Sequence, residues 1–451
     1  MSLNFDTTTL FSGQGIDVNS VVSQLVTAAR APETAWQQQQ QALQSQGSAL
    51  TTLNNDLSAL SDKVDALKDV AGALGNVTTS SSNSNIVTAT AQPATAAGTH
   101  VVVVNSLAKT SSYYTDPVES GTTLLTDGGS FTIQIGSGSA TTISIDSSDD
   151  TLQTLASKIN GLDLGVSANV ITDANGARLS VVAQSSGVPG DITISSDTTG
   201  LNLTKAAKGE NASLSVDGVP VSSASNSVSG IVNGVTFNLV GAAPGTEVTV
   251  GVASDTNGAV QAVNDFVSAY NTAIQDLNAQ FTYNSNTKTG GPLSGDTTAR
   301  MVQQQLLSFA NYAVAGSGSF ATLGSLGISM NNDGTLSVDA AALNNAVSSD
   351  YTDFQNFFQG TSGFATYVSN QLGPLTDPTE GAFYVELKSD QSSFQDLQDS
   401  IDNLETYIAS QQQQWLTQYN QINVTLQQLP LLQQQIDAEL GFIGNNSSNS
   451  K

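Results

Sequence analysis

The chain has 451 residues, no cysteine, a single histidine and a formal net charge of −26, because 38 acidic residues face only 12 Lys and Arg. This acidity argues against nucleic acid and anionic membrane surfaces as partners, since both repel a strongly negative chain. With no cysteine and only His100, zinc sites, disulfides and Cys/His nucleophilic pairs are excluded. No other catalytic pattern is present, so we predict a protein without enzymatic activity, metal or cofactor.

The N-terminal region predicts two consecutive helices. No positively charged segment precedes an apolar run, because the first basic residue is Arg30, so we expect no cleaved signal peptide. No stretch of 18 apolar residues exists either, and we expect no membrane insertion. The first helix begins at Asp17, a good N-cap, and ends near Ala29. Pro32 then starts a second helix at its first turn, where proline is tolerated, and this helix runs to about Val70.

The second helix carries an apolar residue at every seventh position, with further leucines interleaved. This spacing keeps one narrow apolar stripe facing a partner helix and is typical of a coiled coil. Gly47 lies within the helix and costs about 1 kcal/mol relative to Ala, so we predict a hinge there. The stripe consists of Trp36, Leu43, Leu50, Leu53, Leu57, Leu60, Val64 and Leu67.

From Val77 to Asp255 the composition changes to Ser, Thr, Gly and Val, and the apolar period becomes two. Such alternation, bounded by Asp-Gly, Asn-Gly and Pro-Gly turns, predicts a β-rich region. One short helix interrupts it over 151–160. We expect His100 to be a strand residue and not a ligand. The predicted strands cover 86–90, 100–104, 131–135, 142–145, 178–183, 192–195, 213–216, 234–239 and 246–252.

Helical periodicity returns at Gly258 and continues to the C-terminal region. Asn332-Asp333-Gly334 forms a hairpin turn between Ile328 and Leu336, which explains this segment better than a calcium loop does. The shorter predicted helices cover 258–280, 296–312, 339–346 and 350–359.

A long C-terminal helix follows Gly381 and ends near Gly441, with a kink expected at Pro430. It carries a second apolar stripe with the same seven-residue step. Seven successive steps favour a long rod-like pairing over two helices of an ordinary bundle. The stripe consists of Phe394, Leu397, Ile401, Leu404, Ile408, Trp415, Ile422, Leu429, Leu432 and Ile436.

Each stripe needs a partner helix, and the simplest partner is the other end of the same chain. Both helices meet the β-rich region, so they must run antiparallel, and we expect facing residue numbers to sum to about 455. In this register Trp36 lies within two turns of Trp415. An intervening helix, 258–280 or 296–312, is the alternative. The predicted stalk seam packs Leu50, Leu53, Leu57 and Leu60 against Phe394, Leu397, Ile401, Leu404 and Ile408.

The predicted fold is therefore α+β and multidomain, with terminal helices forming a coiled-coil stalk or leg and a β-rich head inserted between them. We predict a terminal helical leg from 1–45 and 410–451, and a helical stalk domain from 46–77 and 255–409. The head consists of one β-rich subdomain, 78–108 and 205–254, and a second, 109–204, inserted into the first with the short helix.

Four ordered segments resemble the flagellar filament cap family, hook-associated protein 2 of the FliD type. They are the run from Gly13 to Val26 followed by Arg30-Ala31-Pro32, the Pro292-Leu293-Ser294-Gly295-Asp296 element, the Leu326-Gly327-Ile328 element with its Asp333-Gly334-Thr335-Leu336-Ser337-Val338-Asp339 continuation, and the stretch after Leu152, which is similar to a flagellin/hook insertion motif. The Gln-rich linker around 37–46 departs from the family in its low content of basic residues.

The resemblance implies a homo-oligomeric ring, usually a pentamer, at the distal filament tip, where it helps exported flagellin to fold and insert. It also implies export through the flagellar type III apparatus, an extracellular location, an export chaperone, and hook–filament junction proteins as partners. The alternatives are another flagellar axial protein, such as a junction protein, or a tip adhesin for host mucin or glycan. The residues expected at the subunit or filament interface are Ile16, Val18, Val22, Leu25, Val26, Trp36, Trp415, Ile422, Leu429 and Ile436.

Overall fold

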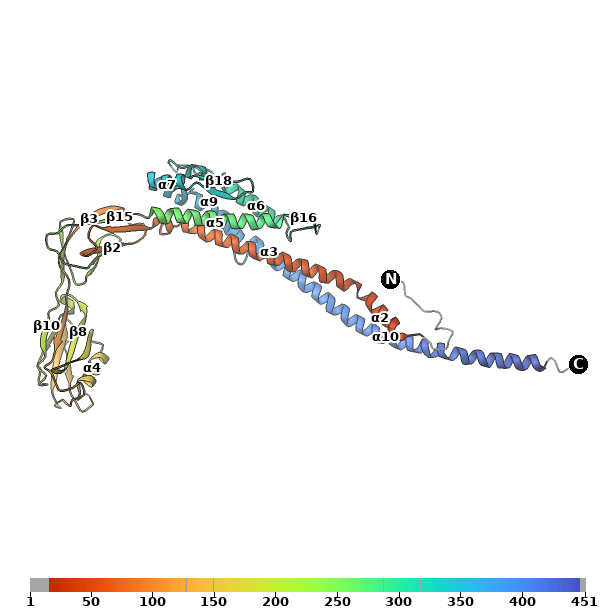
Figure 1. The fold of residues 1–451 in the computed structure, drawn as a ribbon, viewed down its shortest axis with the longest axis horizontal. Helices are drawn as coiled ribbons and strands as arrows, with labels where there is room; N and C mark the ends of the chain where they lie inside the picture. The colour runs from red at the N-terminus through yellow and green to blue at the C-terminus, as the bar shows by residue number, and fades with distance from the viewer. Residues whose placement is uncertain (1–15, 126–127, 149, 287, 317, 447–451) are drawn as a thin grey trace.

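The computed structural model describes residues 16–125, 128–148, 150–286, 288–316 and 318–446. The molecule is elongated (Figure 1): β-sheets form one end, a helical bundle lies next to them, and a rod of terminal helices extends to the other end. This arrangement confirms the predicted α+β fold with a β-rich region between terminal helices. Among the described residues, no helix combines the length and apolar content needed to cross a membrane.

The terminal helices are α2 (Val18–Ala29), α3 (Ala31–Lys68) and α10 (Ala382–Asn446). Asp17 caps α2 as expected, because its carboxylate accepts a hydrogen bond from the Ser20 backbone N–H at 3.1 Å. Pro32 occupies the first turn of α3, and α3 is one continuous helix through Gly47, where a hinge was expected. Helix α10 also continues past Pro430, and past its predicted end at Gly441, to Asn446.

The helical bundle packs the C-terminal half of α3, from about Leu50, against five further helices and a small hairpin. We call this the upper half of α3 and the N-terminal half its lower half. The helices are α5 (Thr256–Gln280), α6 (Thr297–Phe309), α7 (Ala340–Ser349), α8 (Tyr351–Gln359) and α9 (Phe364–Thr376), of which α9 was not predicted. The hairpin pairs β18 (Ile328–Met330) with β19 (Leu336–Val338), as expected. A second, short hairpin pairs β16 (Tyr283–Asn284) with β17 (Thr289–Gly290). The bundle core gathers apolar residues from Leu50 to Leu74 and from Ala259 to Phe383.

The β-rich part nearer the bundle consists of a five-stranded sheet, in the order β1-β15-β3-β11-β12, and a three-stranded sheet, β13-β14-β2. Val87, Phe237 and Val250 lie in the apolar core of this part. The strands are β1 (Val77–Ser81), β2 (Val87–Ala91), β3 (Gly98–Ser106), β11 (Ala212–Val216), β12 (Val219–Ser223), β13 (Ser227–Val232), β14 (Val235–Leu239) and β15 (Val248–Ser254).

The second β-rich part lies at the far end of the molecule (Figure 1) and has its own core around Phe131, Leu155 and Leu179. A four-stranded sheet, β10-β4-β8-β7, and a three-stranded sheet, β6-β5-β9, form it together with α4 (Leu152–Gly161). The strands are β4 (Thr110–Tyr114), β5 (Ser130–Ile135), β6 (Thr141–Ser144), β7 (Val166–Asp173), β8 (Gly176–Ser186), β9 (Ile192–Ser195) and β10 (Thr204–Ala207).

This second part is inserted between two paired strands. The chain leaves the first sheet at the end of β3 and returns in β11, where Ser106 and Ser213 are register partners. A bridge and an ion pair between Lys109 and Glu210, with Nζ–Oε2 at 2.9 Å, join the entering and leaving segments. Strand β10 pairs with β4 of the inserted part and ends at Ala207, three residues beyond the predicted limit of 204. Every strand expected from the sequence is present within a few residues, whereas β1, β4, β7, β10, β12, β13, β16 and β17 were missed.

Candidate functional site

The rod is the part of the molecule in which the predicted interface residues lie. There α2 and the lower half of α3 run antiparallel to α10 (Figure 1). The Gln40 side-chain amide donates to the Gln398 carbonyl oxygen at 3.1 Å, and the Ile16 backbone N–H donates to Asn423 Oδ1 at 2.7 Å. The residue numbers of facing partners therefore sum to about 437, as an antiparallel pair requires.

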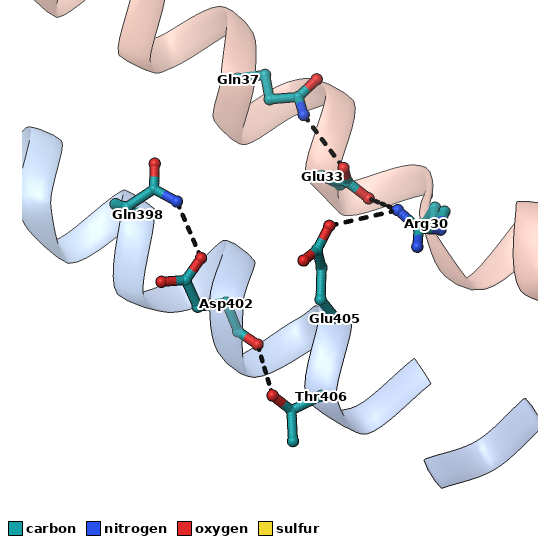
Figure 2. Close-up of polar contacts among 7 residues, drawn as sticks. All are labelled: Arg30, Glu33, Gln37, Gln398, Asp402, Glu405 and Thr406. Carbon is teal, nitrogen blue, oxygen red and sulfur yellow. Dashed lines mark hydrogen bonds and ion pairs between the residues drawn. The ribbon is translucent and has the colours of Figure 1, made fainter. Parts of the chain in front are cut away.

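Arg30 ties the junction of α2 and α3 to α10 (Figure 2). Its guanidinium lies 3.0 Å from Glu33 Oε2 and 3.6 Å from Glu405 Oε1, and Gln37 donates to the other oxygen of Glu33 at 3.1 Å. Opposite them, Gln398 donates to the Asp402 carboxylate at 2.9 Å. Arg30 and Glu405 are exposed, whereas the Glu33 side chain is only 14% exposed. Ion pairs at exposed positions contribute only about 0–1 kcal/mol each. The network therefore helps to define the register, and apolar contacts must supply most of the stability.

The predicted pairing of the stalk seam is wrong. Leu50, Leu53, Leu57 and Leu60 are fully buried, but in the bundle core. Helices α5 and α9 cover this half of α3: Lys63 pairs with Asp265 of α5 at 3.4 Å, and Lys68 donates to Ser369 of α9 at 2.8 Å.

The intervening helix kept as an alternative is thus present, together with α9, and α10 begins only beside the lower half of α3. The observed register also separates Trp36 from Trp415 by about 21 Å along the rod, at 1.5 Å per residue, so their predicted proximity is wrong.

The α10 half of the predicted seam packs on α2 and the lower half of α3. Ile401 and Ile408 are buried, whereas Phe394, Leu397 and Leu404 are half-buried. Two grooves flank the contact around Leu43. One, of about 530 Å³, is lined by Gln39, Ala42, Leu43, Gln46, Ser393, Asp396, Leu397 and Ser400. The other, of about 350 Å³, is lined by Leu43, Gln44, Gly47, Leu387, Asp390, Gln391 and Phe394.

The rod is thus a single-seam pair with open sides. A narrow seam of this kind leaves apolar side chains partly in water unless further helices pack against it.

From about Ile422 onward, α10 extends past the start of the described N-terminal segment (Figure 1). Its apolar residues recur there at helical spacing, and Ile422 is 47% exposed, Leu429 51% and Ile436 48%. We call this surface the distal stripe; it consists of Ile422, Leu426, Leu429, Leu432, Ile436 and Leu440. A soluble helix normally buries such a stripe, so its exposure makes it a candidate interaction surface.

The structure divides the predicted interface residues into two groups. Val18 and Val22 are buried where α2 packs on α10, and Ile16, Leu25, Val26, Trp36 and Trp415 are half-buried in the rod. Ile422, Leu429 and Ile436 remain exposed on the distal stripe. Leu426 and Leu440 were not predicted, although their spacing from Ile422 and Ile436 places them beside the same stripe. Residues 1–15 and 447–451 of the predicted leg lie outside the described residues.

Three family models match the chain in order. The hook-associated protein 2 N-terminal model matches residues 14–111, the flagellin hook IN motif matches 130–185, and the hook-associated protein 2 C-terminal model matches 209–430. The IN motif thus coincides with the inserted β-rich part and the other two with its flanks.

Relatives and a solved structure agree. The B-type flagellar hook-associated protein 2 of Pseudomonas aeruginosa PAO1 is 30% identical over 402 residues, covering 81% of this chain and 83% of that protein. The Escherichia coli K12 hook-associated protein 2 is 26% identical over 389 residues, covering 80% and 82%. The crystal structure of the D1-D2-D3 domains of the E. coli flagellar cap protein FliD superimposes with a TM-score of 0.63 at 26% identity, covering 76% of this chain and 99% of that one. By identity, coverage and fold, the chain belongs to the flagellar hook-associated protein 2, or FliD, family of flagellar cap proteins.

Proposed function

We propose that this chain caps the flagellar filament as a homo-oligomeric ring, and that the distal stripe is the surface through which it joins that assembly. The exposure of Ile422, Leu429 and Ile436 in the single chain carries the proposal. Burial of apolar surface yields roughly 25 cal/mol per Å², so a helix face of this kind favours packing against other helices. The family is one of flagellar cap proteins, so the helices that pack on the stripe would belong to neighbouring cap subunits and to flagellin.

The grooves beside the rod support the same proposal. Leu43 and Leu397 line one groove, and Phe394 lines the other. Both grooves combine apolar walls with Gln and Asp side chains, a surface that can pack against a heptad helix and still tolerate water. In the assembly, neighbouring helices would fill them and complete the seam.

The domain division belongs to this proposal. The leg, 1–45 and 410–451, would contact the filament, while the helical domain, 46–77 and 255–409, would carry the head. The separate apolar cores of the bundle and of the two β-rich parts support treating 78–108 with 205–254 as one head subdomain and 109–204, extended to Ala207, as the other.

The finer features follow from the family. We propose a pentameric ring that assists flagellin insertion, export through the flagellar type III apparatus with a chaperone, and neighbouring hook–filament junction proteins. The role is structural and not enzymatic.

A strain lacking its own cap gene tests the proposal. It would be complemented with a stripe variant, Leu429→Asp/Ile436→Asp, or with a control, Gln427→Asp/Gln434→Asp, whose exposed positions lie on the opposite face of α10. An unpaired charge in an apolar seam is costly. We expect secreted unpolymerised flagellin and short filaments from the stripe variant, and normal filaments from the control.

Circular dichroism and thermal unfolding of both purified variants should match the parent chain, because the stripe is exposed in the monomer. Normal filaments from the stripe variant would reject the distal stripe as an assembly surface.

A further inference from the structure

One carboxyl oxygen near the start of α10 lacks the hydrogen-bond donor that its burial requires. Glu386 Oε2 is inaccessible to solvent and has no partner. The neighbour within hydrogen-bonding reach is another carboxylate, Asp296, which caps α6 by accepting from the Ala299 N–H at 2.9 Å. Thr298 also bonds to Glu386, and the charge of Asp390 acts on it from one turn along α10. Two carboxylates cannot bond to each other unless one of them holds a proton.

The interface of α3 and α5 repeats this arrangement. Asp56 of α3 lies within hydrogen-bonding reach of Asp276 of α5, and its buried Oδ2 has no donor. The buried carbonyl oxygens of Asn54 and Gln280, on the same two helices, also lack donors. The amide groups of Asn54 and Gln280 carry N–H donors, and Gln280 Nε2 donates to the backbone carbonyl of Asp276 at 3.3 Å. A proton on one carboxyl of the pair would supply the donor that Asp56 Oδ2 lacks.

No cation of the surrounding elements is paired with these carboxyls. The ion pairs among the described residues include Lys63 with Asp265, but none that involves either carboxyl pair. Arg300 of α6 donates to the Ser294 carbonyl at 3.1 Å and lies over the Phe281 ring. Lys388 is exposed on α10.

Two further elements near these carboxyls present neutral or acidic groups. On α3, Gln44 and Gly47 line the groove that contains Asp390. Asp333, in the β18–β19 turn, bonds to Thr335 and presents its backbone carbonyl to Asn278 of α5.

We propose that Glu386–Asp296 and Asp56–Asp276 are proton-binding pairs, and that one proton on each pair strengthens the packing of α10 on α6 and of α5 on α3. The helical domain would then hold its helices more tightly in mildly acidic surroundings than at alkaline pH. This inference does not depend on the assembly surface proposed above.

The direction of the effect follows from the titration of the two partly buried groups, Asp56 and Glu386. Burial, followed by the hydrogen bond and charge of Asp276, raises the pKa of Asp56 to about 6. Burial, followed by Asp296 and Asp390, raises the pKa of Glu386 to about 7 against an opposing hydrogen bond from Thr298.

An acid whose pKa is raised in the folded state binds more protons there than in the unfolded state. Its contribution to the free energy of unfolding therefore falls as pH rises. The stabilisation is complete below the ordinary values of 3.8 and 4.5 and is lost as pH rises through about 6 and 7.

Hydrogen exchange of the full chain at pH 5.5 and 8.0, corrected for intrinsic rates, tests the proposal. We expect protection of α5, α6 and the first turns of α10 to fall about tenfold at pH 8.0, a value discounted for the partial exposure of both pairs. The variant Asp56→Asn/Glu386→Gln should keep high protection at both pH values, because an amide donates to the facing carboxylate without a proton.

The control is Asp62→Asn/Glu380→Gln, which changes exposed acids of α3 and of the turn before α10; it should keep the parent's pH dependence. If the first variant fails to fold, Asp276→Asn/Asp296→Asn replaces it, because Asn caps α6 as well as Asp does. Equal protection of the parent at both pH values would overturn the proposal. So would an unchanged pH dependence in the amide variants.

Discussion

The register of the rod can be tested by placing cysteines at facing positions, since the chain has no cysteine of its own. Gln40→Cys/Gln398→Cys replaces two side chains that hydrogen-bond at 3.1 Å. The comparison variant is Asn55→Cys/Ser400→Cys. Positions 55 and 400 face each other only in the register expected from the sequence. In the observed register, position 400 lies opposite about position 38, so 17 residues of helix, or roughly 26 Å, separate it from position 55.

A short bismaleimide cross-linker, applied to dilute monomer, should join positions 40 and 398 within one chain and leave 55 and 400 unlinked. Gel mobility and mass spectrometry of the linked peptides distinguish the two results. Both pairs avoid fully buried apolar positions, so the substitutions should leave the fold intact, and circular dichroism checks this. Efficient linkage of 55 with 400, without linkage of 40 with 398, would refute the register and the account of how α5 and α9 displace α10.

Three further predictions concern the domains. Leu57→Ala, at a fully buried bundle position, should cost about 2–5 kcal/mol in denaturant unfolding, whereas Leu429→Ala on the distal stripe should change monomer stability by less than about 0.5 kcal/mol. A hydrogen bond from the His100 ring, and after it one from a backbone N–H, holds the pKa of Asp217 below its ordinary 3.8. The stabilisation that these bonds give the folded chain is therefore lost as pH falls through the folded-state pKa of Asp217. Asp217→Asn should remove that acid dependence, which the NMR signals of the single histidine would report. Deleting 109–207 should leave a soluble, folded remainder, since β3 and β11 already pair where the chain would be rejoined; a molten product would contradict separate cores.

The sequence predicts well which face of each helix is buried, and predicts poorly where along one helix its partner lies. The heptad step identifies Leu50, Leu53 and Ile408 as buried positions, and each is buried. It cannot tell which helix covers them, because sliding two heptad helices by whole repeats keeps the stripes in contact. The partner of this half of α3 depends on tertiary packing, which the heptad pattern does not record. Helices α5 and α9 cover the half of α3 that the sequence assigns to α10, and α9 was not predicted.

Three of the strands that were missed share a physical cause. Strands β12 and β13 expose most of their side chains, and β7 buries only its first residues. Their Ser, Thr, Asn and Gly content weakens the alternation on which prediction of a half-buried strand depends. They form because neighbouring strands supply hydrogen-bond partners, which a local pattern does not record.

The candidate interface was identified in part. Val22 and Ile422 have the same apolar character and similar spacing, yet the first is 2% exposed and the second 47%. The difference arises because α2 packs on α10 and buries its own apolar stripe there, while α10 continues beyond the described part of the N-terminal segment. Which part of a stripe stays free is therefore a property of the folded chain.

Photo-cross-linking on capped filaments tests the central claim most directly. A photoreactive side chain at position 429 probes the distal stripe, and one at position 427 probes the opposite face of the same helix turn. We predict that position 429 links to a second copy of the chain or to flagellin, and that position 427 gives few or no such links. Absence of links from 429 on filaments that are normally capped, or equal links from both positions, would contradict the claim that the distal stripe joins the cap to its assembly.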